Sequence, residues 1–172
     1  YDLPDLCKQL IDNCVTHTHV DRLLIYADGS SQSQKKRCPP QWIEEHDISD
    51  TWCFAVFGEN YQSEQLMFMG FQCQPVLYDT TAPHHLGTAH LGADAAEREA
   101  LTWAAIWRLG QNHRLPTIFL TDSMLTRGQA SGDIGAATAM TPLRLLRGLF
   151  QALRAALPGD YLRVEHVMGH AG

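Results

Sequence analysis

The spacing of apolar residues changes several times along this chain of 172 residues. Residues 23–27 are apolar or aromatic without interruption, which is typical of a buried strand, and Asp28-Gly29-Ser30 then predicts a tight turn. Residues 51–58 and 66–78 are rich in aromatic and β-branched residues. They predict an antiparallel hairpin that turns at residues 58–60 and pairs with the first strand.

Two later segments have the three- and four-residue spacing of amphipathic helices. The first, residues 95–109, contains neither Gly nor Pro and follows Asp94, a candidate capping residue. The second, residues 142–157, begins at a proline. Strands at residues 117–121 and 161–167 follow these helices, so we expect parallel strands joined by crossover helices. The order of elements predicts one α/β domain with a mixed sheet.

The first 21 residues differ from the rest of the chain. Apolar residues between positions 2 and 14 have helical spacing, and a polar stretch then leads into the first strand. We therefore expect an N-terminal helix and linker over residues 1–21 and a globular domain over residues 22–172.

Composition and charge narrow the class of protein. A 45% hydrophobic content suits one domain with a sizeable core, and no apolar run is long enough to cross a membrane. The five cysteines are scattered, without a CxxC pair, which indicates free thiols and an intracellular location. The net charge of −6 argues against a protein that coats nucleic acid. A nuclease remains compatible with it, because metal-binding carboxylates add negative charge.

Three carboxylates are candidate metal ligands. Asp28 and Asp122 each follow a buried strand, and Glu97 shares a helical stripe with Ala100 and Leu101. A carboxylate at the head of a buried stripe is costly unless it is paired or bound to a cation. The alternative is an ordinary Asp-Gly turn together with a first-turn Glu that favours the helix dipole. Two strands that each end in Asp favour the metal site.

The same residues lie in four short motifs whose order resembles the ribonuclease H family. The motifs are Asp28-Gly29-Ser30, Ala96-Glu97, Thr121-Asp122-Ser123 and Gly169-His170-Ala171-Gly172. The segment before the last strand makes the chain look most similar to ribonuclease H domains of retrotransposon reverse transcriptase polyproteins. The resemblance implies a ribonuclease H-like fold, with a mixed five-stranded sheet and helices on both faces.

The resemblance also implies an activity. A member of the family hydrolyses the RNA strand of an RNA–DNA hybrid, with Asp28, Glu97 and Asp122 binding two Mg²⁺ ions, or Mn²⁺ in their place. His170 matches the histidine that assists turnover or product release. The remainder of a reverse transcriptase polyprotein is then a possible partner, and a membrane is not.

Candidate nucleic-acid contacts follow the first strand. Lys35, Lys36 and Arg37 are the only three consecutive basic residues and could contact a phosphate backbone, although a solvated loop is the simpler interpretation. Ser30, in the loop after Asp28, is a candidate for sensing the 2′-hydroxyl of RNA.

The chain also departs from the family pattern. The family has a fourth metal-binding Asp in a helix after the Gly-His-Ala-Gly loop, whereas Gly172 is the last residue here. We therefore expect a C-terminally truncated domain with weak cleavage. Two alternatives stay open: a DNA-processing nuclease of the same fold, and a non-catalytic nucleic-acid-binding or interaction domain.

Overall fold

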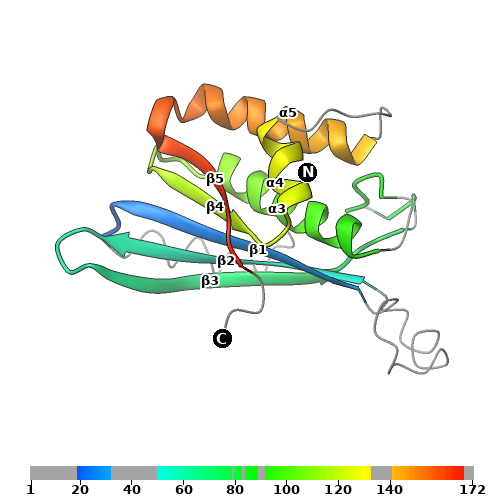
Figure 1. Cartoon of the computed structure of the whole chain (residues 1–172), viewed down its shortest axis with the longest axis horizontal. Coiled ribbons are helices and arrows are strands. Elements are labelled where there is room, and N and C mark those ends of the chain that lie inside the picture. The colour runs from blue at the N-terminus through cyan, green and yellow to red at the C-terminus, as the bar shows by residue number, and fades with distance from the viewer. Residues whose placement is uncertain are drawn as a thin grey trace.

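The computed structural model describes residues 19–31, 50–78, 80–82, 84–88, 92–132 and 141–168. Figure 1 shows a twisted sheet with a layer of helices above it. The elements of the described residues are β1 (Arg22–Ser31), β2 (Asp50–Asn60), β3 (Gln65–Pro75), α3 (Ala93–Leu109), β4 (Thr117–Thr121), α4 (Met124–Ser131), α5 (Thr141–Ala156), the 3₁₀ turn η2 (Gly159–Tyr161) and β5 (Leu162–His166).

The sheet has the strand order β3-β2-β1-β4-β5, with β1 at its centre. β1 and β2 are antiparallel, as are β2 and β3, whereas β1 and β4, and β4 and β5, are parallel. The predicted mixed α/β sheet is therefore confirmed. Helix α3 precedes β4, and helices α4 and α5 connect β4 to β5, so helices join the parallel strands as predicted.

The end of β1 differs from the prediction. Pairing with β4 stops at Ala27 opposite Thr121, but β1 continues along β2 until Ser31 lies opposite Asp50. Asp28 is consequently part of an extended strand, and the predicted tight turn at Asp28-Gly29-Ser30 is wrong. The sequence could not show this, because the pairing that extends β1 comes from residues 19 to 25 positions away.

The hairpin turn also lies later than predicted. β2 continues through Gly58 to Asn60, and residues 61–64 form the turn, with Glu64 at a left-handed φ of 53°. The register between β2 and β3 shifts by a bulge next to Val56 and Phe57. Gly58 is thus a strand residue that packs against Val20.

The helices pack on one face of the sheet and enclose the main core. α3 contacts β1 and β2, while α5 packs on α3 in the same layer above the sheet (Figure 1). Trp52 of β2 stacks on Trp103 of α3 at a centroid distance of 5.3 Å, and Phe119 of β4 meets Phe150 of α5 edge-on at 5.2 Å. All four rings are almost completely buried. Truncating one such ring to Ala typically costs about 3–5 kcal/mol, so these contacts hold the helix layer firmly on the sheet.

The described residues do not test two parts of the sequence prediction. Within the described residues helices cover one face only, so the expected second helical layer stays a prediction. The predicted helix at residues 2–14 lies outside the described residues. No helix in the described part of the chain is long and apolar enough to cross a membrane.

The expectation that all five cysteines are free is wrong for two of them. Cys53 of β2 and Cys73 of β3 lie directly opposite one another, with their Cα atoms 4.2 Å apart, and form a disulfide. Only the strand register brings them together, so their spacing in the sequence gave no signal. The argument for an intracellular location from free thiols does not extend to this pair.

Candidate metal centre

Asp28, Glu97 and Asp122 converge at one edge of the sheet. Each offers a carboxylate oxygen, and these oxygens all lie within 4.8 Å of one another. The three residues come from β1, from α3 and from the residue directly after β4. No other group of three or more His, Cys, Asp or Glu residues suited to a metal ion occurs among the described residues.

The parallel pairing of β1 and β4 brings the two aspartates together. Ala27 is paired with Thr121, so the next residue along each strand is an aspartate. Parallel strands point the same way, and both carboxylates therefore leave the sheet at the same edge. His166, at the end of β5, lies 3.1 Å from the backbone carbonyl of Asp122 through Nε2 and steadies this edge. The sequence analysis did not identify His166.

Gly29 allows Glu97 to reach the two aspartates. A Cβ atom at position 29 would lie 2.3 Å from both the carbonyl carbon of Ala96 and the backbone nitrogen of Glu97. No side chain fits in that space, so only glycine lets the first turn of α3 approach β1 this closely. The backbone N–H of Gly29 also donates a hydrogen bond to the Glu97 carboxyl group. The glycine after Asp28 therefore serves close approach of two backbones and not a turn.

A second contact holds the start of α3. The Oδ2 atom of Asp50 accepts a hydrogen bond from the backbone N–H of Gly92, at 3.1 Å, and another from the Tyr78 hydroxyl. Asp50 is 1% exposed, and Gly92 directly precedes the helix. The predicted capping residue, Asp94, instead lies in the first turn and makes no capping hydrogen bond. Asp50 was missed because its partners are distant in sequence.

Burial and neighbouring negative charge raise the pKa of Glu97 to about 9. Burial of the carboxyl group is the largest cause, followed by a hydrogen bond and charge repulsion from Asp28 and by the charge of Asp122. The hydrogen bond from Gly29 acts in the opposite direction. Without a cation, Glu97 therefore holds a proton at neutral pH.

Glu99, two residues further along α3, shows what a satisfied buried carboxylate looks like. It is 3% exposed and accepts hydrogen bonds from the Thr88 hydroxyl at 2.8 Å and from Nε1 of Trp103 at 3.4 Å. Burial raises its pKa as well, but these donors favour the charged form. Glu99 thus belongs to the packing of the 84–88 loop on α3.

The three carboxylates fit a hard divalent cation. Oε2 of Glu97 is buried and has no hydrogen-bond partner in the described part of the chain. Mg²⁺ and Mn²⁺ prefer carboxylate oxygens from separate elements, with water completing the shell. A bound cation would favour the charged form of Glu97, against the burial and the neighbouring negative charge that raise its pKa.

The remaining predicted site residues are only partly described. Ser30 is exposed on β1, two residues from Asp28 and opposite Thr51. His170 and the basic segment Lys35, Lys36 and Arg37 lie outside the described residues.

Comparison with known proteins agrees with this topology. No protein-family model matches the chain, and no curated protein matches it. Among solved structures it is similar to the N-terminal ribonuclease H domain of a Mycobacterium tuberculosis protein, at a TM-score of 0.53 and 17% identity over 89% of this chain and 86% of that one.

Two further structures support the same assignment. Ribonuclease H1 of Halobacterium salinarum has a TM-score of 0.51 and 16% identity, covering 86% of each chain. The prototype foamy virus protease–reverse transcriptase has a TM-score of 0.52 and 16% identity over 89% of this chain, which spans only 18% of the viral protein. The chain therefore has a ribonuclease H-like fold, as its short motifs suggested.

Proposed function

We propose that this domain is a metal-dependent nuclease that hydrolyses the RNA strand of RNA–DNA hybrids. The observation that supports this most directly is the meeting of Asp28, Glu97 and Asp122, with their oxygens within 4.8 Å, on a ribonuclease H-like fold. The buried, unpartnered Oε2 of Glu97 adds to it, because packing alone gives no reason for that atom.

Each residue has a distinct part in the proposed reaction. Asp28 and Asp122, on neighbouring strands, would hold divalent cations at a rigid edge of the sheet, and Glu97 would close the site from α3. Two such cations stabilise the negative charge that develops on the attacking and leaving oxygens of a phosphodiester. Gly29 and Asp50 fix the distance between the helix and the strand, so the carboxylates are positioned before substrate arrives.

The test is cleavage of a labelled RNA–DNA hybrid in Mg²⁺ and in Mn²⁺ by Asp28→Asn and Asp122→Asn. Each change removes a charged ligand with little change in shape, and we expect a loss of about a hundredfold or more. Asp160→Asn, an exposed aspartate in η2, is the matched control and should cleave like the wild type. Cleavage by Asp28→Asn at the control rate would contradict the proposal.

A DNA-processing nuclease of the same fold is tested with the same variants. Duplex DNA of the same sequence replaces the hybrid as substrate. Cleavage of DNA but not of the hybrid, lost in Asp28→Asn, would assign the site to that alternative. A hybrid that is bound but not cut in either metal would favour the non-catalytic interaction domain.

We also propose that the basic segment and Ser30 contact the hybrid. Neutralising Lys35, Lys36 and Arg37 together should weaken hybrid binding and reduce the slope of log affinity against log salt by up to about three. An unchanged slope would leave these residues as a solvated loop. Ser30→Ala should lower the preference for hybrid over DNA duplex, because a hydroxyl near Asp28 can sense the 2′-hydroxyl.

The source of the domain is part of the same proposal. A place within a reverse transcriptase polyprotein, and hence an intracellular location, is supported by the likeness to a viral chain of which this fold is a small part. An encoded reverse transcriptase adjoining these residues would establish it.

A further inference from the structure

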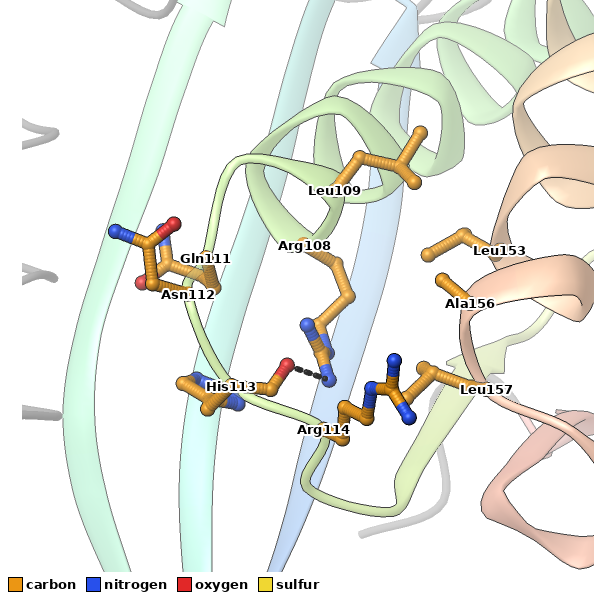
Figure 2. A pocket seen from close by; sticks show the side chains of 9 residues that line it. All are labelled: Arg108, Leu109, Gln111, Asn112, His113, Arg114, Leu153, Ala156 and Leu157. Carbon is orange, nitrogen blue, oxygen red and sulfur yellow. Dashed lines mark hydrogen bonds between the residues drawn. The ribbon is translucent and has the colours of Figure 1, made fainter.

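A pocket lined by two arginines lies at the opposite end of α3 from Glu97. Figure 2 shows it between the loop at residues 110–116 and the last turn of α5. Its volume is about 280 Å³. Arg108 and Arg114 contribute the positive groups, Leu153 and Leu157 contribute an apolar wall, and no acidic residue lines it.

Arg108 is a buried cation without an anionic partner. It is 2% exposed, and Nε donates to the Thr117 hydroxyl at 2.8 Å while Nη2 donates to the carbonyls of His113 and Leu115 at 3.2 and 3.0 Å. None of these acceptors is charged, and no carboxylate of the described residues pairs with it. Burial accordingly lowers the pKa of Arg108 to about 10. An arginine in this state gains from a nearby anion.

The ring of His113 does not face this pocket. Figure 2 shows it on the side of the loop away from Arg108 and Arg114. Its Nδ1 accepts a hydrogen bond from the backbone N–H of Leu115 at 3.4 Å, and its Nε2 is buried. The backbone carbonyl of His113 is instead turned toward Arg108, from which it accepts a hydrogen bond. The charged donors that line the pocket are therefore those of the two arginines.

We propose that this pocket binds a phosphate-class oxyanion, either as the free ion or as a phosphate monoester. Arg108 supplies a buried positive charge, and exposed Arg114, which forms no ion pair with the described residues, supplies a second charge at the rim. Such charge-assisted hydrogen bonds are the strong ones in proteins. The wall of Leu153 and Leu157 can cover the organic part of an ester.

This site is separate from the metal centre. Glu97 and Arg108 are eleven residues apart on one helix, which at 1.5 Å per residue places them roughly 16 Å apart along its axis. Phosphate binding at the pocket therefore does not require the carboxylates of the metal centre. A variant that abolishes metal binding can still be tested for phosphate binding, and the reverse also holds.

The simpler interpretation is that Arg108 only ties the loop at residues 110–116 to α3. Substitution of Arg114 distinguishes this interpretation from phosphate binding, because Arg114 makes none of the hydrogen bonds by which Arg108 holds the loop.

The experiment is a titration with inorganic phosphate, in metal-free buffer at constant ionic strength, followed by the NMR amide shifts of residues 110–116. We expect saturable shifts in the wild type that chloride does not reproduce.

One variant and a matched control complete the test. Arg114→Gln should weaken phosphate binding about tenfold, the loss of one charge-assisted hydrogen bond. Arg144→Gln, an exposed arginine near the other end of α5, should bind phosphate like the wild type. Amide shifts that do not saturate with phosphate concentration would overturn the proposal, and so would equal phosphate affinities of Arg114→Gln and Arg144→Gln.

A second titration identifies the form of the anion. Phenyl phosphate binding at least several-fold more tightly than inorganic phosphate supports a monoester that uses the apolar wall. Equal affinities support the free ion. Leu157→Ala should reduce the difference in the first case only, and Arg114→Gln should weaken both ligands.

Discussion

The proton on Glu97 makes metal binding sensitive to pH. Because the pKa of this carboxyl group is raised to about 9, a cation must displace a proton at neutral pH. We predict that the apparent affinity for Mg²⁺ rises with pH up to about 9, by at most about tenfold per pH unit. Calorimetry in buffers of different ionisation enthalpy measures the released proton directly.

Two substitutions on the same helix sharpen that experiment. Glu97→Gln should remove both the proton release and its pH dependence. Glu99→Gln changes a carboxyl group that is more deeply buried but satisfied by Thr88 and Trp103, and should leave both intact. Proton release that persists in Glu97→Gln would show that another group is titrating.

Gly29 is the residue whose size matters most for the site. A methyl group there would overlap the backbone of Ala96 and Glu97, so Gly29→Ala should destabilise the fold by about 1–3 kcal/mol and weaken Mg²⁺ binding. Denaturant unfolding and metal titration measure the two effects.

Gly148→Ala is the control for that substitution. Gly148 lies inside α5 with nothing within 4 Å of a new Cβ atom, so the change should stabilise by about 0.5–1 kcal/mol. Equal unfolding free energies and Mg²⁺ affinities of the two variants would mean that α3 can move away from β1 without loss of stability or of metal binding.

α3 is held against the sheet at its start by Asp50. Asp50→Ala would leave the Gly92 N–H and the Tyr78 hydroxyl without this acceptor, and we predict a loss of about 2–3 kcal/mol in unfolding free energy together with weaker metal binding. Asp94→Ala, in the first turn of the same helix, should cost less than about 1 kcal/mol, since the exposed carboxylate contributes only through charge, to the helix dipole and to Arg98. A metal affinity unchanged in Asp50→Ala would show that Glu97 is positioned without this anchor.

For the whole molecule, the acidic cluster couples stability to pH and to metal. The raised pKa of Glu97 means that the folded protein keeps a proton which the unfolded chain loses above about pH 4.5. The free energy of unfolding contributed by this group therefore falls as pH rises from about 4.5 to about 9. Glu97→Gln should flatten this fall, as measured by unfolding at several pH values in a chelator.

Mg²⁺ should reverse the destabilisation. At about a hundred times its dissociation constant, a cation that binds only the folded state adds about 2.7 kcal/mol. We expect a higher melting temperature in Mg²⁺ than in a chelator for the wild type and no such difference for Asp28→Asn. An equal shift in both proteins would place the bound cation elsewhere.

The local pattern of the sequence was enough to predict much of the fold and the three carboxylates. Apolar runs at residues 23–27 and 117–121 mark strands because burial depends on neighbours one or two positions away. The Asp that follows each run could therefore be placed directly after a buried strand segment, and the stripe of α3 could be placed from its period. The ribonuclease H-like fold was implied by the resemblance of these motifs, in their order, to that family.

Contacts between distant residues were decided only by the tertiary structure. The register of β1 on β2 made Asp28 a strand residue, paired Cys53 with Cys73 and brought Asp50 to the start of α3. The pocket around Arg108 likewise depends on α5 packing beside a loop some forty residues earlier. No periodicity within one segment encodes how two segments meet, because register and close approach are set by the packing of both partners together.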